Sequence, residues 1–208
     1  MSHRMLSAGI ALLVIVAVPA LASGRQARPS RYAATPLSAV EAASLAFMRE
    51  EEAVARAVYV ASAAMWPQVP VFANIAASEA THMAAVRNLL VRYGEPDPIE
   101  DLPLGIFATA EFQDLHDALV ATSELSLIDA LRVGAEIEEL DISDLNGQMA
   151  DIAHPDILAV YDHLRRGSRN HLRAFMRVLT QMGGTYVPVH LSQAEFDAIV
   201  NSPMERGR

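Results

Sequence analysis

Four long stretches with helical periodicity constrain this chain more than any other feature of its sequence. They cover residues 38–65, 71–93, 127–149 and 155–182, and in each of them apolar residues recur every three or four positions. Prolines exclude a continuous helix between the second and third stretches, where we expect only a short helix over 110–121. A capping box that begins at Ser192 predicts a second short helix near the C-terminus. The pattern therefore predicts an all-α four-helix bundle with a long crossover between helices two and three.

The first residues resemble an export signal rather than part of the bundle. Arg4 precedes an apolar run over 6–21, which ends in a small-residue cleavage motif before Ser23. We therefore expect a signal peptide at 1–22, a flexible leader at 23–36, a domain at 37–200 and a tail at 201–208. This organisation predicts a periplasmic or secreted protein. The alternative is an N-terminal membrane anchor, because about 17 apolar residues could just span a bilayer.

Composition excludes several classes of site. The chain has no cysteine, which rules out disulfides, thiolate zinc sites, iron–sulfur clusters and a cysteine nucleophile. It has 16 basic and 25 acidic residues, and its net charge of −9 argues against a nucleic-acid partner.

The informative residues are acids and histidines at positions where a bundle should be apolar. Glu79 and His82 are three residues apart on the apolar face of the second stretch, and Glu138 and Asp141 have the same spacing in the third. His171 lies on the apolar face of the fourth stretch. The first stretch has three consecutive glutamates halfway along it, so at least one of them faces inward in any helix phase: Glu50, Glu51 and Glu52.

Carboxylates and imidazoles that converge in an apolar bundle are the ligands that iron and manganese prefer. Each assignment has an alternative. Consecutive glutamates are commonly a solvated face, and a single histidine is more often structural than a metal ligand. Glu138 and Asp141 would be exposed if the buried stripe of their helix consisted instead of Ala130, Val133, Ile137 and Leu140.

Segments 48–52, 72–83, 137–145 and 167–175 resemble those of DUF2202, a bacterial and archaeal domain of unknown function in the ferritin-like superfamily. The likeness covers about 37–200 and implies a ferritin-like bundle, but no settled activity. A more distant likeness is to rubrerythrin-type di-iron proteins. The residues that match their ligand helices are Glu52, Arg56, Tyr59, Glu79, His82, Glu138, Asp141 and His171.

One position departs from that pattern. Ser168 stands where the rubrerythrin-type fourth helix has a glutamate three residues before its histidine. The departure leaves open an asymmetric metal pair, a single metal, or a site completed by Asp141 or Glu139.

The resemblance implies one or two iron or manganese ions and chemistry that oxidises the metal or reduces oxygen or peroxide. The expected ligands are the carboxylates of Glu52, Glu79, Glu138 and Asp141 and the imidazoles of His82 and His171. Arg56 and Tyr59 would orient the carboxylates. The alternative is a metal-free structural or binding protein of the cell envelope. A homo-oligomer is compatible with either function.

Overall fold

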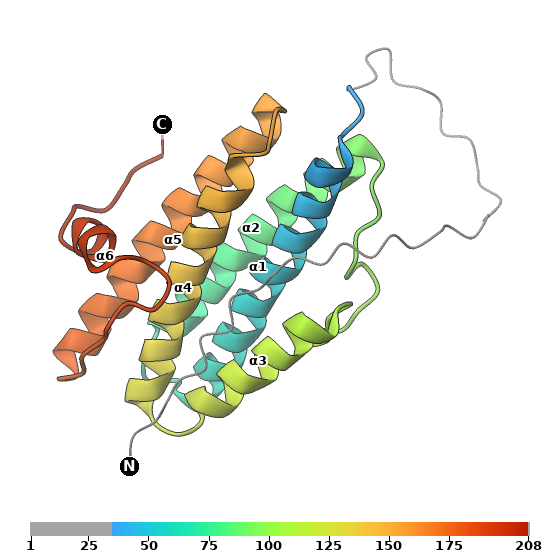
Figure 1. Ribbon diagram of the computed structural model, residues 1–208. Coiled ribbons are helices and arrows are strands. Elements are labelled where there is room, and N and C mark those ends of the chain that lie inside the picture. Colours follow the sequence, from blue (N-terminus) through green and yellow to red (C-terminus); the bar gives the residue numbers. More distant parts are fainter. Residues whose placement is uncertain (1–34, 208) are drawn as a thin grey trace. The chain divides into compact units, whose positions relative to one another are not determined.

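The computed structural model describes residues 35–207, which contain helices and irregular segments but no strand (Figure 1). The helices are α1 (Ala39–Met65), α2 (Val71–Tyr93), α3 (Ala110–Ser123), α4 (Leu127–Met149), α5 (Pro155–Gln181) and α6 (Gln193–Val200). The predicted all-α bundle is therefore confirmed, including the two short helices.

Local capping chemistry accounts for the helix boundaries. Ser38 and Glu41 form a capping box at the start of α1, and Ser126 caps α4 through the backbone N–H of Asp129. Gly94 ends α2 in the left-handed conformation, with a φ of 74° that few other residues tolerate. Pro155 occupies the first turn of α5, where its missing N–H costs nothing.

The four long helices form two hairpins that pack against each other. α1 packs along α2 and α4 along α5, while contacts between α2 and α5 and between α1 and α4 join the hairpins. The connection from α2 to α4 returns along the bundle and includes α3, so α2 and α4 run in the same direction (Figure 1). This is the long crossover that the prolines predicted.

Two apolar clusters fill the bundle, one toward each end. One is rich in aromatic side chains and includes Tyr59, Phe72 and Phe175. The other includes Met48, Leu145 and Tyr161. A layer of buried acids and largely buried histidines belongs to neither cluster, and burying such groups is unfavourable unless something compensates their charge.

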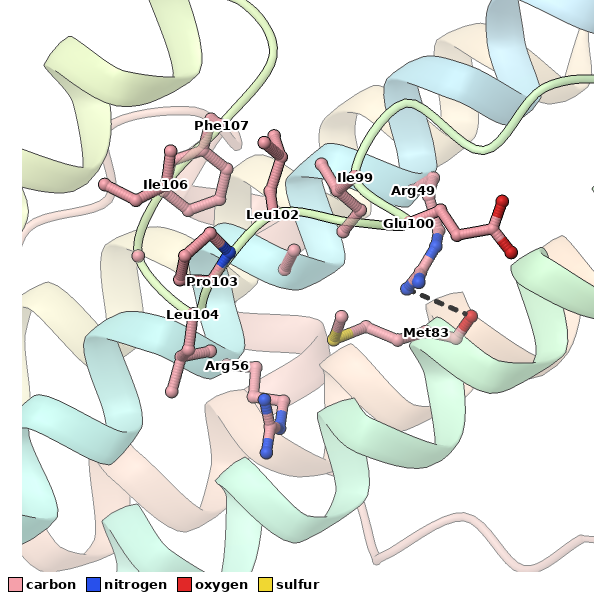
Figure 2. A pocket seen from close by; sticks show the side chains of 12 residues that line it. Arg49, Arg56, Met83, Ile99, Glu100, Leu102, Pro103, Leu104, Ile106 and Phe107 are labelled. Carbon is pink, nitrogen blue, oxygen red and sulfur yellow. Dashed lines mark hydrogen bonds between the residues drawn. The ribbon is translucent and has the colours of Figure 1, made fainter.

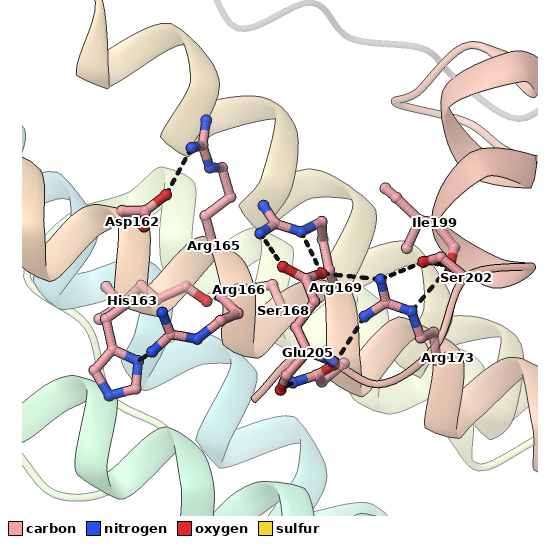
Figure 3. A network of polar contacts seen from close by, with 12 residues as sticks. Asp162, His163, Arg165, Arg166, Ser168, Arg169, Arg173, Ile199, Ser202 and Glu205 are labelled. Carbon is pink, nitrogen blue, oxygen red and sulfur yellow. Dashed lines mark hydrogen bonds and ion pairs between the residues drawn. The ribbon is translucent and has the colours of Figure 1, made fainter. Parts of the chain in front are cut away.

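The C-terminal tail is held against α5 by a polar network (Figure 3). Arg169 and Arg173 both pair with the Glu205 carboxylate. The Asn170 side chain donates to the Glu205 carbonyl at 2.9 Å and accepts from its N–H at 2.8 Å. Two of the arginines on the basic face of α5 therefore form ion pairs within the chain itself.

The predicted signal peptide and most of the predicted leader, residues 1–34, lie outside the described residues. Among residues 35–207, no helix is both long and apolar enough to cross a membrane.

Glu41 joins the start of α1 to the turn between α4 and α5. Its carboxylate accepts hydrogen bonds from the N–H of Ala153 at 3.0 Å, the N–H of His154 at 3.1 Å and the His154 ring at 2.7 Å. Burial alone would raise its pKa, but these hydrogen bonds and those from Ser38 outweigh burial and lower the pKa from 4.5 to about 2.

We expect Glu41→Gln to be less stable than the wild type at pH 7 by about 2 kcal/mol, because hydrogen bonds to a charged group are lost. A lowered folded-state pKa stabilises the fold above the unfolded pKa, and this stability is lost as the pH falls from about 4.5 to about 2. The difference in melting temperature should therefore close across that window. Glu124→Gln, at the exposed end of α3, should show little difference at any pH. A constant Glu41→Gln gap between pH 6 and pH 2 would contradict this explanation.

Candidate metal centre

Glu79 lies at the centre of the buried polar layer, with one histidine near each of its carboxylate oxygens. Its Oε2 is 2.6 Å from His82 Nδ1, and its Oε1 is 2.8 Å from His171 Nδ1. Glu52 adds an oxygen 3.2 Å from His82 Nδ1, and Glu138 adds one 3.4 Å from His171 Nδ1. The result is two groups of potential ligands that share Glu79: Glu52, Glu79 and His82, and Glu79, Glu138 and His171.

Several of these short contacts are not hydrogen bonds. Both Glu79 oxygens, Glu138 Oε2 and His171 Nδ1 are buried without a hydrogen-bond partner, although they lie close to one another. A hydrogen bond requires the N–H to point at the acceptor. Short separations without that alignment are the arrangement expected when nitrogen and oxygen lone pairs face a common cation.

Neighbouring residues fix the orientation of the potential ligands. The Tyr59 hydroxyl donates a hydrogen bond of 2.6 Å to Glu138 Oε1, which agrees with the predicted orienting role of Tyr59. His171 Nε2 is 3.0 Å from the Ser78 hydroxyl, which leaves Nδ1 facing Glu79. The contact of Ser78 with His171 could not be predicted from the sequence, because a serine on a helix has no distinctive spacing.

Electrostatics in the layer favour protons or cations. Burial raises the pKa of the Glu138 and Asp141 carboxyls, and in Asp141 the charges of the surrounding glutamates raise it further. Burial would lower the pKa of both imidazoles, but the carboxylates of Glu52 and Glu138 reverse this effect and raise the pKa of His82 and of His171. Without another cation, the chain must therefore hold protons in this layer.

All three consecutive glutamates of α1 are buried, each in a different environment. Glu52 faces His82. Glu50 faces the start of α3, where its carboxylate accepts from the N–H groups of Ala108 at 2.8 Å and Thr109 at 3.2 Å. Glu51 lies beside Asp144 of α4. The solvated-face alternative is wrong here, because α2, α3 and α4 enclose α1 on several sides.

On α4 the stripe that contains Glu138 and Asp141 and the alternative apolar stripe are both largely buried. Burial of the apolar stripe therefore does not leave the two acids exposed to solvent. Glu138 and Asp141 are at most 1% exposed, and Val133 and Ile137 are also buried. Glu139 is buried but faces elsewhere, because its Oε2 accepts hydrogen bonds from the Tyr186 hydroxyl at 2.6 Å and the Val189 N–H at 2.9 Å. It therefore holds the C-terminal segment rather than completing the metal centre.

Asp141 lies beside the two groups rather than inside either. The carboxylates whose charges act on Asp141 are those of Glu51, Glu52, Glu138 and Glu79. Both Asp141 oxygens are buried without a hydrogen-bond partner. Ser168 is also buried, and its hydroxyl donates to the Leu164 carbonyl of its own helix. Position 168 on α5 therefore offers no carboxylate to the layer, whereas Asp141 adds a buried carboxylate from α4.

Arg56 does not take the orienting role that we expected. Within residues 35–207 it makes no hydrogen bond or ion pair with the buried carboxylates. It lines a surface pocket of about 210 Å³ between α1, α2 and the connection to α3, together with Met83 and Leu104 (Figure 2). Arg49, in the same pocket, pairs with Asp97.

With this geometry established, comparison with known proteins places the chain. The model of a family described as an uncharacterized protein domain, DUF2202, matches residues 41–203. The chain belongs to the DUF2202 family. It is 44% identical over 172 residues to uncharacterized protein MJ0754 of Methanocaldococcus jannaschii, covering 83% of this chain and 92% of that protein.

A solved structure supports the same fold for this DUF2202 chain. The crystal structure of hypothetical protein MJ0754 from Methanococcus jannaschii matches it with a TM-score of 0.80 and 43% identity, covering 85% of this chain and 100% of that one. The sequence-based assignment to DUF2202 is therefore confirmed, whereas its placement in the ferritin-like superfamily stays a prediction. Neither description carries an activity.

Proposed function

We propose that this protein binds two transition-metal ions, iron or manganese, in the buried layer of its bundle, with Glu79 bridging them. The observation that carries the proposal is the sharing of Glu79 between two ligand groups: its two oxygens lie 2.6 Å and 2.8 Å from the nitrogens of two different histidines, and neither oxygen has a hydrogen-bond partner. Imidazole and carboxylate donors without thiolates suit iron and manganese.

Charge balance supports the same occupancy. With both imidazoles neutral, the buried carboxylates carry a charge that two divalent cations neutralise: Glu52, Glu79, Glu138 and Asp141. The residues present therefore fit a pair of ions despite Ser168. Glu52 and His82 would hold one ion and Glu138 and His171 the other, with Asp141 available to either.

Bound iron or manganese would supply one-electron redox chemistry toward oxygen or peroxide. The protein's own part is to hold the ligands, to exclude water from a layer that is almost fully buried, and to orient Glu138 through Tyr59. We further propose that the activity is exported, because residues 1–22 have the pattern of a signal peptide. The crossover connection also supports a ferritin-like origin of the bundle.

One observation favours a second candidate, a metal-free structural protein of the cell envelope. If both histidines are protonated, His82 and His171 are each within ion-pairing distance of Glu79. The same atoms would then form buried ion pairs in place of a metal centre.

Metal content and heat stability separate the two candidates. We expect the purified protein, reconstituted anaerobically with ferrous iron, to hold about two ions per chain by elemental analysis. Chelation should then lower the melting temperature, because ligand at 100 times its dissociation constant stabilises the fold by about 2.7 kcal/mol per site. No bound metal and an unchanged melting temperature would favour the metal-free candidate.

A further inference from the structure

Glu51 is a buried acid for which the proposed metal pair provides no role. Its side chain is 3% exposed, and both carboxylate oxygens lack a hydrogen-bond partner. Its charge neighbours are Asp144 on α4 and Glu52 beside it on α1. The other buried acids that lie outside the metal centre behave differently: Glu41, Glu50 and Glu139 each accept at least two hydrogen bonds that anchor a turn, a helix start or the tail.

Glu51 belongs to a continuous series of acids that leads from the surface to the metal centre. Asp144 is partly exposed and lies near His190 of the C-terminal segment. Glu51 follows, and then Asp141, which lies three residues before Asp144 on the same face of α4 and is buried among carboxylates that include those of Glu51 and Glu79. We call Asp144, Glu51 and Asp141 the acidic series.

The acidic series attracts cations but lacks the geometry of a resident site. Burying Glu51 and Asp141 without donors is unfavourable, and a cation relieves that cost. Within residues 35–207, however, the only groups of three or more acids and histidines whose ligand atoms all lie within 4.8 Å of one another are the two that share Glu79. The three carboxylates of the acidic series do not converge on one point, so they would pass a cation on rather than hold it.

The opposite seam, between α2 and α5, is less suited to cations. His163 is exposed there, with its ring 6.0 Å from that of His82. An Arg166 nitrogen donates to His163 Nδ1 at 3.2 Å, which occupies that lone pair and places a positive charge at this entrance.

We propose that the acidic series is the route by which divalent cations enter the metal centre, between α1 and α4. The proposal rests on the proposed function. Cations reach Asp144 first and then pass Glu51 and Asp141 to the ligands around Glu79. The negative charge along the route raises the local cation concentration and therefore the rate of loading.

Loading kinetics of the full chain with cobalt(II), followed by its visible absorption in stopped flow, test the route. We expect Glu51→Gln and Asp144→Asn each to slow loading about 10-fold, with the same final stoichiometry as the wild type. Loading of the wild type should slow with added salt more steeply than loading of Asp144→Asn. Glu50→Gln is the matched control. Glu50 is the buried acid next to Glu51, but its carboxylate accepts from the start of α3 and does not belong to the acidic series, so this variant should load at the wild-type rate.

Glu51→Gln should also fold at least as stably as the wild type, since it replaces a buried acid whose oxygens meet no donor with a neutral side chain of the same shape. Wild-type rates in both acidic-series variants, or slow loading in His163→Gln alone, would overturn the route while leaving the metal centre intact. A lower final stoichiometry in Glu51→Gln would make Glu51 a resident ligand and would also overturn the route. A wild type that takes up neither cobalt nor iron would overturn the proposed function, and the route with it.

Discussion

Replacing Glu79 with glutamine should remove both metal ions at once. Each Glu79 oxygen faces a different histidine, at 2.6 Å and 2.8 Å, and no other residue among those described belongs to both ligand groups. Glutamine keeps the shape but offers one neutral oxygen. We expect elemental analysis to fall from about two ions per chain to fewer than 0.1, and the apparent affinity to weaken at least about 100-fold, as is typical when a ligand or its support is lost.

Single-histidine variants sharpen this prediction. His82→Gln should leave one ion with Glu79, Glu138 and His171, and His171→Gln should leave one with Glu52, Glu79 and His82. Glu50→Gln should retain both ions, because the Glu50 carboxylate contacts the start of α3. Two ions in Glu79→Gln would refute the bridging assignment. If the wild type holds no metal, the same substitution should instead cost about 3–5 kcal/mol, because two buried ion pairs are broken.

Replacing Gly167 with alanine should disable the half of the centre that contains His82. A Cβ atom at this position would lie 2.5 Å from His82 Cε1 and 2.6 Å from Nε2. The ring cannot move freely, because it is stacked on His171 with a centroid distance of 5.6 Å and lies between Glu52 and Glu79. We expect the bound metal to fall from about two ions to one, and the stability to fall by about 1–3 kcal/mol from overpacking.

Gly147→Ala is the matched control within a helix. Gly147 is exposed on α4, and a Cβ there would meet no atom within 4 Å. Alanine is a better helix former than glycine by about 1 kcal/mol, so the melting temperature should rise by about 2–4 °C with both ions retained. Calorimetry and elemental analysis of the two variants check the pair. Equal melting temperatures and equal metal content would show that the contact between Gly167 and His82 has no consequence.

The helices could be predicted closely because their boundaries depend on local chemistry. Ser38, Ser126 and Ser192 accept hydrogen bonds from the first turns of their helices, and Gly94 and Pro155 act through their own backbone geometry. Residues three apart lie on one face of any helix, which is why the pairs of Glu79 with His82 and of Glu138 with Asp141 were recognisable. That all the acids and histidines of the centre lie in one layer could be seen only from the packed bundle, because they come from four different helices.

What could not be predicted depends on contacts between distant segments. Helical periodicity assumes one buried face, but α1 and α4 are enclosed on several sides, so Glu50, Glu51 and Glu139 are buried as well. The donors to Glu139 come from an irregular segment near Tyr186, which has no period from which to infer its position. Arg56 matched a family pattern in sequence, yet it lines the pocket beside the connection.

The two ligand groups differ in how much of the chain they need. Glu52, Glu79 and His82 all lie on the hairpin of α1 and α2, whereas the second group also needs Glu138 from α4 and His171 from α5. During synthesis, the residues of the first group are therefore all made before those of the second hairpin. An ion captured at that stage would neutralise part of the charge that opposes docking of α4 and α5. Metal supply would then affect how readily the second hairpin docks, and docking would be slower in a chain made in metal-poor conditions.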